Sequence, residues 1–191
     1  MTSTTNTQQQ LRMVWPKNKL DQPPAVQVAP GYRLRTYRPG DEPQFFHVMS
    51  LAGFERWDMA QLLPWLQKIV PEGWFLVEAE ATGQLVATAM ANHNPNPYYP
   101  FGGELGWVAA HPDHKGQRLG MTVCAAVVTR LLRGGYTSIY LNTDDERLPA
   151  IKTYLTLGFR PLILTTDMTA RWEAICHNLA WPFTPDLWRM L

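Results

Sequence analysis

The segment from Glu104 to Asn142 constrains the fold more than any other part of the sequence. Residues 104–110 are apolar and β-prone, and residues 137–142 (TSIYLN) read as a second strand. Residues 117–133, between them, carry apolar side chains at helical spacing: Leu119, Val123, Ala126, Val127 and Leu131. A helix that connects two strands in this way makes them parallel neighbours through a crossover. The sequence therefore predicts an α/β domain built around one parallel β-α-β pair.

The remaining elements extend this unit into a β-α-α-β-β-β-α-β-α-β-α order. Strands are predicted at 31–37, 73–80, 85–92, 104–110, 137–142 and 159–165, and helices at 42–51, 58–68, 117–133, 149–157 and 169–179. Short turns between the early strands favour antiparallel pairing. The expected fold is a single-domain, mixed, mostly antiparallel sheet with a central parallel β-α-β pair and flanking helices.

Three regions are predicted along the chain. Residues 1–30 are expected to form an N-terminal tail and an extended arm that lies on the domain, because they combine a polar start with several prolines. Residues 31–165 form the α/β domain. Residues 166–191 contain a C-terminal helix that packs on the same domain, with Trp172, Ile175 and Leu179 on its apolar face.

Composition excludes several classes of protein. The 191 residues carry a net charge of +1 and show no basic stripe, which argues against a nucleic-acid partner. No apolar run reaches the length of a membrane-spanning helix, and the polar start MTSTTNTQQQ is unlike a secretory signal. Cys124 and Cys176 lie within helical patterns and are expected to be buried thiols in a reducing compartment. We therefore expect a cytoplasmic protein with neither a nucleic-acid nor a membrane partner.

The loop His111–Gly120 (HPDHKGQRLG) has the features of a phosphate-binding corner. It follows a strand and opens a helix, so several backbone N–H groups and the positive end of the helix dipole point to one place. Gly116 and Gly120 allow a ligand to approach the backbone closely, and Lys115 and Arg118 add positive charge. The Walker and dinucleotide glycine patterns are both absent. Taken alone, the segment is equally compatible with an ordinary strand–helix turn that needs a glycine.

A second motif lies on the helix predicted at 149–157. Its residues Ala150, Tyr154, Gly158 and Phe159 place a tyrosine on or beside the buried face, one turn before a glycine cap. A buried tyrosine hydroxyl needs a polar partner. Tyr154 either hydrogen-bonds the backbone or protonates a leaving group.

Together, the two motifs resemble those of the GCN5-related N-acetyltransferase (GNAT) superfamily. That family opens its central helix with a basic residue or Gln, then x-x-G-x-G/A, and carries A-x-x-x-Y-x-x-x-G-F on a later helix. Lys115 and Gly120 match the first motif, and the second matches fully at Ala150, Tyr154, Gly158 and Phe159. Arg118 departs from the pattern, because it stands where the family has its middle glycine. Arg147 likewise stands where the family often has Asn.

The resemblance implies that acetyl-CoA is the co-substrate and that no metal takes part. The central strand and the TSIYLN strand would splay apart to admit the pantetheine arm, which would bond to the backbone of the central strand. The N–H groups of the loop would hold the pyrophosphate. The implied donor-binding residues are Val108, Ala109, Ala110, Lys115, Gly116, Gln117, Arg118, Leu119, Gly120 and Met121.

Acyl transfer to an amine requires a base and an acid. Glu104, at the start of the central strand, is the best-placed base, and a solvated strand-end residue is the alternative reading. Tyr154 would protonate the departing thiolate, with packing as its alternative role. His111 and His114 have no nearby Cys or Glu partners for a metal, and Cys124 is expected to be a core residue rather than a nucleophile.

The acceptor site is the least determined part of the prediction. Phe54 and Trp57, between the first two helices, and Tyr98 and Tyr99, before Glu104, are the candidate substrate residues, with simple packing as the alternative. The leading hypothesis is an N-acetyltransferase that acts on a small-molecule amine or a peptide. A non-catalytic acyl-CoA-binding regulatory module is the alternative, and a thiol or sugar acceptor stays open. A homodimer is compatible with the apolar residues of the arm and the C-terminal helix.

Overall fold

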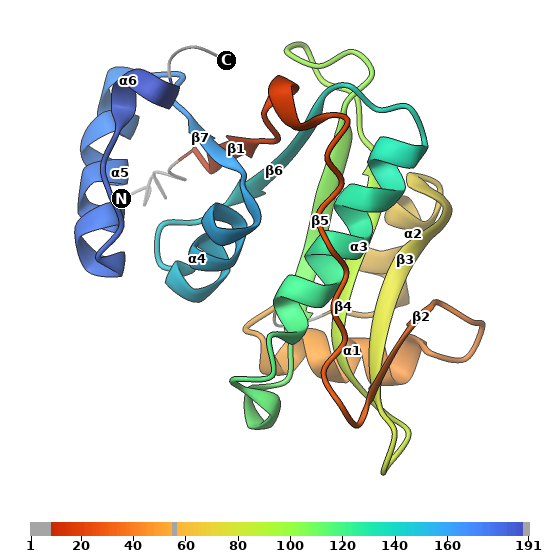
Figure 1. Ribbon diagram of the computed structural model, residues 1–191. Coiled ribbons are helices and arrows are strands. Elements are labelled where there is room, and N and C mark those ends of the chain that lie inside the picture. Colours follow the sequence, from red (N-terminus) through yellow and green to blue (C-terminus); the bar gives the residue numbers. More distant parts are fainter. Residues whose placement is uncertain (1–8, 55–56, 189–191) are drawn as a thin grey trace, which may run out of the picture.

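A computed structural model describes residues 9–54 and 57–188, and they form one seven-stranded sheet in the order β2-β3-β4-β5-β6-β1-β7 (Figure 1). The strands are β1 (Leu11–Val14), β2 (Tyr32–Thr36), β3 (Ile69–Ala79), β4 (Gln84–His93), β5 (Gly103–Ala110), β6 (Ile139–Thr143) and β7 (Arg160–Leu162). Only β5 and β6 pair in parallel among the described strands, and the other neighbours are antiparallel. The predicted mixed sheet with one parallel pair is confirmed.

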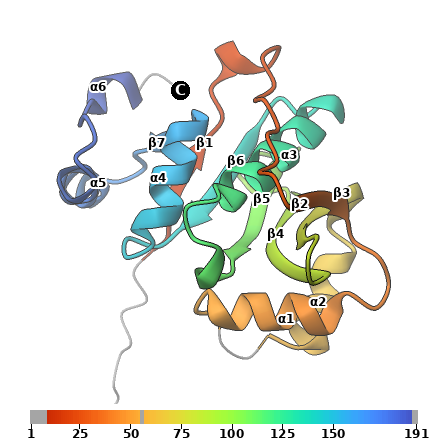
Figure 2. The same ribbon diagram turned by 60° about the horizontal axis from the view of Figure 1, so that its bottom comes forward.

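Helices cover both faces of this sheet. They are α1 (Glu42–Leu51), α2 (Met59–Leu66), α3 (Leu119–Arg133), α4 (Leu148–Leu157), α5 (Thr166–Leu179) and α6 (Pro185–Trp188), with 3-10 turns at Lys17–Lys19 and Pro112–His114. Figure 2 shows α1 and α2 on the opposite side of the sheet from α3. Two separate apolar cores result, one centred on Phe45 and Trp74 under α1 and α2, and a larger one centred on Val127 and Trp172.

Strand β1 differs from the sequence prediction. We expected Leu11 to lie in an extended arm, whereas Leu11–Val14 pairs with β6 on one side and with β7 on the other. Leu11, Met13 and Val14 are buried. A strand of four residues close to several prolines gives too short an alternation to be recognised in the sequence. Residues 24–29, by contrast, run along the surface of α3 (Figure 1).

Several element boundaries also shift. Helix α2 ends at Leu66 rather than Lys68, and β3 begins at Ile69 rather than at Gly73. The helix predicted from Gln117 begins at Leu119. The last strand is shorter than predicted, and α5 starts earlier at Thr166. The predicted glycine cap at Gly158 is confirmed, since its φ of 117° lies in the left-handed region.

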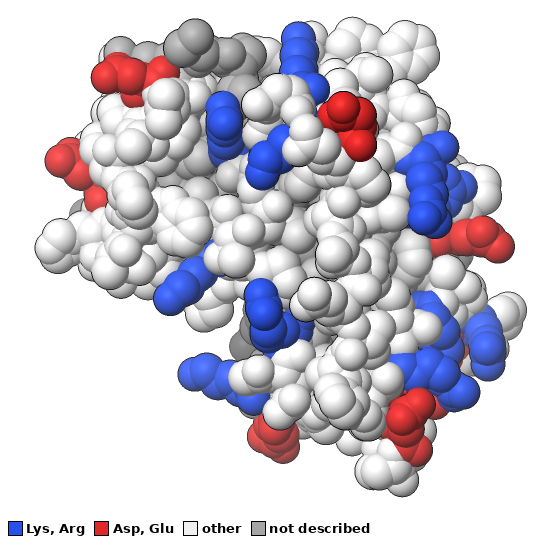
Figure 3. Space-filling model, viewed as in Figure 1, with Lys and Arg blue, Asp and Glu red and all other residues white. Residues whose placement is uncertain are grey.

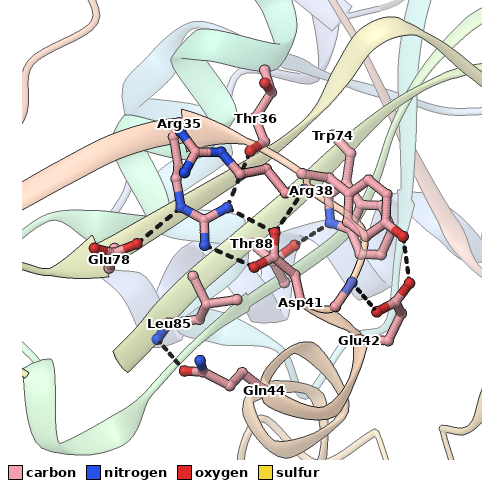
Figure 4. A network of polar contacts seen from close by, with 12 residues as sticks. Arg35, Thr36, Arg38, Asp41, Glu42, Gln44, Trp74, Glu78, Leu85 and Thr88 are labelled. Atoms are coloured by element: carbon pink, nitrogen blue, oxygen red, sulfur yellow. Dashed lines mark hydrogen bonds and ion pairs between the residues drawn. The ribbon is translucent and has the colours of Figure 1, made fainter. Parts of the chain in front are cut away.

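A polar network fixes α1 against the edge of the sheet (Figure 4). Arg35 on β2 donates two hydrogen bonds to Asp41, at 2.7 and 2.8 Å, and one to Glu78 on β3 at 2.9 Å. Asp41 stands at the N-cap of α1, but its carboxylate makes no capping hydrogen bond and is bound instead to Arg35 and to the N–H of Arg38. Asp58 caps α2, in a capping box with Gln61.

The surface is mixed in charge. Figure 3 shows Lys and Arg side chains interspersed with Asp and Glu, with broad uncharged areas between them. Within residues 9–54 and 57–188, no helix combines the length and the apolar character needed to cross a bilayer. Cys124 and Cys176 are both buried free thiols, as predicted.

Candidate active site

The site is built where β5 and β6 separate. The two strands pair in parallel only at Gly103–Ile139 and Glu104–Tyr140, although β5 continues to Ala110. Figures 1 and 2 show the strands diverging beyond this point. The β5 backbone also carries a bulge, because Gly106 pairs with Met90 whereas Ala109 pairs with Thr88, which leaves two residues of β5 opposite one of β4. Trp107 lies in this bulge with a φ of 54°.

A pocket of about 280 Å³ fills the space that this divergence opens. Its walls come from β5, β6, the start of α4 and the α1–α2 connection. They comprise Gln10, Phe54, Trp65, Asn94, Glu104, Leu105, Gly106, Trp107, Val108, Asn142, Thr143, Asp144, Arg147 and Tyr154. Two polar atoms of this lining, Trp107 Nε1 and Thr143 Oγ1, are buried without a hydrogen-bond partner among the described residues.

Glu104 is buried in this pocket rather than solvated at a strand end, with 7% of its surface exposed. Asn94 Nδ2 donates to one carboxylate oxygen at 2.7 Å, and Asn142 Nδ2 donates to the other at 3.0 Å. Burial raises the pKa of the Glu104 carboxyl above its ordinary value, while these two hydrogen bonds and the charges of Lys68 and Arg12 partly oppose the rise. A buried carboxylate with a raised pKa is suited to general base catalysis near neutral pH.

Tyr154 reaches the same pocket from α4. Its side chain is 5% exposed, and burial raises the pKa of its hydroxyl, with the neighbouring Cys124 adding to the rise and Arg147 opposing it. The hydroxyl therefore stays protonated at all ordinary pH values. Among the described residues it has no hydrogen-bond partner, so the backbone contact considered from the sequence is not made. Glu104 and Tyr154 thus share one pocket.

The loop His111–Gly120 turns through two residues with positive φ. Gly116 has a φ of 89°, and Arg118, at the N-cap of α3, has φ 58° and ψ 25°. The left-handed conformation at Arg118 costs a non-glycine residue about 1 kcal/mol or more, which gives a physical reason for glycine at this position in the motif. The Arg118 side chain makes no capping hydrogen bond, so it does not cover the N–H groups of the first turn of α3.

A second cavity, of about 360 Å³, adjoins this loop. Gln117, Arg118 and Met121 line it from α3 and the loop, and Thr156 and Leu157 line it from α4. The segment 24–29 closes another side, where Thr122 Oγ1 donates to the carbonyl of Gln27 at 2.6 Å. Lys115 and Gly116 are exposed beside it. The exposed, positively charged loop thus lies at one end of the β5–β6 divergence, and the buried Glu104 carboxylate lies at the other.

The predicted substrate residues separate into two groups. Phe54 lines the Glu104 pocket, and Trp57 packs behind it against Trp107 with ring centroids 4.3 Å apart. Tyr98 and Tyr99 lie elsewhere, around the guanidinium of Arg12, and line neither cavity. The aromatic wall instead consists of Phe54, Trp65 and Trp107, with Arg147 stacked 3.7 Å above the Phe54 ring.

Sequence reasoning missed the two asparagines that hold Glu104. Asn94 follows β4 and Asn142 lies on β6, so only the folded sheet brings them together. The order of the elements predicts that β5 and β6 are parallel neighbours, but only the folded sheet gives the register, in which Glu104 is paired with Tyr140, two residues before Asn142. No local signal marks Asn94. Trp65 and Trp107 were likewise outside the predicted acceptor wall.

His111 and His114 lie with ring centroids 5.3 Å apart, and the Nδ1 atoms of both already have hydrogen-bond partners, in Asp113 N–H and the Tyr32 hydroxyl respectively. Over the part of the chain that the structure describes, no group of three or more His, Cys, Asp and Glu side chains is arranged to hold a metal ion.

Comparison with known proteins identifies the family to which this architecture belongs. The family model described as "Acetyltransferase (GNAT) family" matches residues 39–159, which include Glu104, the loop and Tyr154. The chain belongs to the GNAT acetyltransferase family. Acetyl-CoA is the co-substrate of that family. The match leaves β1 and the segment 24–29 of this GNAT chain outside the family model.

Curated relatives of this GNAT chain include proteins named mycothiol acetyltransferase. The one from Sanguibacter keddieii is 30% identical over 156 residues, which cover 76% of this chain and 49% of the relative. The one from Thermomonospora curvata is 30% identical over 147 residues, covering 71% and 46%. The chain therefore spans about half the length of the curated relatives it matches.

Solved structures support the fold. A GCN5-related N-acetyltransferase from Sphaerobacter thermophilus superposes with a TM-score of 0.63 at 22% identity, covering 80% of this chain and 47% of that one. The ribosomal-protein-S18-alanine N-acetyltransferase from Escherichia coli superposes with a TM-score of 0.53 at 19% identity, covering 66% and 76%.

Proposed function

We propose that this chain transfers an acetyl group from acetyl-CoA to an amine by direct attack, with Glu104 as the base and Tyr154 as the acid. The observation that carries the proposal is that both side chains line one pocket, at the point where β5 and β6 separate. The chain's membership of the GNAT family supplies the reaction class.

The donor would occupy the divergence, with its thioester beside Tyr154 and its pyrophosphate at the loop. Beyond Glu104 the β5 backbone no longer pairs with β6, so the edge of Val108 is free to bond a pantetheine arm. The N–H groups of residues 116–121 would hold the pyrophosphate, beside the cavity that Gln117, Arg118 and Met121 line. Lys115 and Arg118 supply positive charge at the exposed end.

Glu104 would take a proton from the acceptor ammonium group, directly or through one water molecule. The neutral amine then attacks the thioester carbonyl, so that a C–N bond forms as the C–S bond breaks. An N–H group of the β5 bulge near Val108 would stabilise the negative charge that develops on the carbonyl oxygen. Glu104 must be ionised to act, so activity is expected to fall as the pH drops through its raised pKa.

Tyr154 would donate its hydroxyl proton to the departing CoA thiolate. Because burial raises the pKa of this hydroxyl, it is a proton donor over the whole working range of pH. The electron pair of the C–S bond leaves with sulfur, which takes the Tyr154 proton. The acceptor nitrogen loses two protons in all: the first goes to Glu104 before attack, and the second, lost as the intermediate collapses, returns to the Tyr154 oxygen. Glu104 then releases its proton to solvent, so the proton balance closes without a covalent enzyme intermediate.

The pocket favours a small-molecule acceptor over a protein segment. Its volume of about 280 Å³ must hold both the thioester and the attacking group. Phe54, Trp65 and Trp107 offer an apolar wall, and Asp144 adds a second carboxylate at the rim. The relatives named mycothiol acetyltransferase support the same size class of acceptor.

The test is release of free CoA from acetyl-CoA in the presence of a panel of amino acids, amino sugars, polyamines, peptides and thiols. With the best acceptor, Glu104→Gln should lower kcat/KM by roughly 10²–10⁴-fold, the usual contribution of general base catalysis. The matched control is Glu146→Gln, which removes an exposed carboxylate outside the pocket lining and should leave the rate unchanged.

Two results would contradict the proposal. If Glu104→Gln keeps full activity, Glu104 is not the base. If acetyl-CoA binds, measured by calorimetry, but no acceptor in the panel releases CoA, the chain is an acyl-CoA-binding module instead.

A further inference from the structure

Two positively charged side chains are connected to Glu104 through two asparagines. Arg12 Nε donates to Asn142 Oδ1 at 3.0 Å, and Asn142 Nδ2 donates to Glu104 Oε1 at 3.0 Å. On the other side, Lys68 Nζ donates to Asn94 Oδ1 at 3.1 Å, and Asn94 Nδ2 donates to Glu104 Oε2 at 2.7 Å. Each carboxylate oxygen therefore ends one chain of hydrogen bonds that starts at a cation.

The cations determine which way the asparagine amides face. Lysine and arginine can only donate hydrogen bonds, so the carbonyl oxygen of each asparagine must face its cation. The NH2 group then necessarily faces Glu104. This arrangement presents a donor to each carboxylate oxygen and favours the ionised carboxylate. Without the cation, an amide is free to flip and to present its oxygen, which would favour the protonated carboxyl.

Arg12 reaches this position because β1 lies between β6 and β7. Arg12 is the register partner of Asn142 across the β1–β6 pair. Its guanidinium lies 5.1 Å from the Tyr140 ring centroid and 5.5 and 6.0 Å from those of Tyr98 and Tyr99. These tyrosines, first considered as acceptor residues, thus surround the cation. Residue 12 lies on β1, outside the segment that the family model matches.

Other ionisable groups face the same carboxylate or its pocket. Tyr140 on β6 is the register partner of Glu104 on β5, and its hydroxyl donates to the carbonyl of Asn94 at 2.6 Å. Tyr154, Asp144 and Arg147 line the pocket on the α4 side. None of these replaces the two asparagine donors, whose amide orientation depends on Arg12 and Lys68.

We propose that Arg12 and Lys68 are positioning residues, which act through Asn142 and Asn94 to keep Glu104 ionised and aimed into the pocket at the pH where the enzyme works. The inference rests on the proposed role of Glu104 as base. It assigns a catalytic consequence to a strand that lies outside the family's matched region.

The test compares Arg12→Met, Arg12→Lys and Lys68→Met in the pH dependence of kcat/KM. Loss of either cation should move the acidic limb to higher pH by about one unit, and loss of both should move it further. The rate at the high-pH plateau should change by only a few-fold. Arg12→Lys should restore most of the shift, since it keeps a donor and a charge. Arg33→Met, which removes an exposed cation on β2, is the control and should leave the limb in place.

A second measurement does not depend on turnover. The carboxyl carbon of Glu104, labelled with ¹³C and assigned by its loss in Glu104→Gln, can be titrated by NMR in the free protein. Its midpoint should rise in Arg12→Met and in Lys68→Met. An unchanged midpoint in both folded variants overturns the proposal, whatever the activity. A raised midpoint without any acetyl transfer would keep this inference and refute only the proposed function. Lys68→Met tests the inference independently if Arg12→Met fails to fold.

Discussion

The two ends of the β5–β6 divergence are built in opposite ways. At the loop end, the candidate phosphate contacts lie within residues 115–121 and consist largely of backbone N–H groups, and Lys115, Gly116, Gln117 and Arg118 are exposed. At the carboxylate end, Glu104 is buried and is held by side chains from four separate segments of the chain. The loop end is suited to binding a charged group that projects into solvent. The carboxylate end is suited to controlling one proton.

This difference predicts that substitutions at the two ends will affect different kinetic constants. Changes at the buried end should alter the chemical step and its pH dependence, because they alter groups that meet the reacting atoms. Changes at the loop end should alter the affinity for acetyl-CoA, because they alter only donors to its phosphates.

Among the three substitutions that compare the two ends, the largest effect is expected for Tyr154→Phe. Phenylalanine keeps the ring in the core beside Cys124 and Ile151 but removes the proton donor. We expect kcat to fall by roughly 10²-fold or more, the lower range for general acid catalysis, while the Kd for acetyl-CoA stays within about twofold. Stopped-flow turnover and calorimetry measure the two quantities. Equal loss of rate and of affinity would place Tyr154 in donor binding instead.

A smaller effect is expected for Gly120→Ala, at the loop end. A Cβ at this position meets no heavy atom within 4 Å in the protein itself, and alanine favours helix over glycine by about 1 kcal/mol. The variant should therefore be as stable as the wild type or more so. If the pyrophosphate lies against this backbone, the Kd for acetyl-CoA should rise by roughly tenfold. Unchanged affinity in this variant would show that the donor phosphates lie elsewhere.

The smallest expected effect is the difference in unfolding free energy between Arg118→Gly and Arg118→Ala. Both remove the guanidinium, but only glycine relieves the left-handed backbone, whose φ is 58°. Arg118→Gly should be more stable than Arg118→Ala by about 1 kcal/mol in denaturant unfolding. Both should lose the same few-fold affinity for acetyl-CoA, in a salt-dependent manner. If the two variants unfold alike, the backbone at residue 118 is unstrained.

The same contrast explains what the sequence could predict. The loop and Tyr154 were found because their motifs are local, and their roles depend on spacing within one turn or one helix. Glu104 was found because it starts a recognisable strand. Asn94, Lys68 and Arg12 could not be found, since only the folded sheet brings them to one carboxylate. The position of Tyr98 and Tyr99 just before Glu104 left two roles open, an acceptor wall and simple packing of the loop, because proximity in sequence gives no information on the side that they face.

The position of β1 also has a consequence for folding. Residue 12 pairs with residue 142 on one side and with residue 162 on the other, so β7 joins the sheet only through a strand that is very distant in sequence. Contacts of such long sequence separation form late and slowly, because the chain must close a large loop first. We therefore expect the part of the sheet that carries Arg12 to assemble last. A partly folded molecule would hold a complete phosphate loop but an unsupported base, so the ability to bind acetyl-CoA should appear during refolding before the ability to use it.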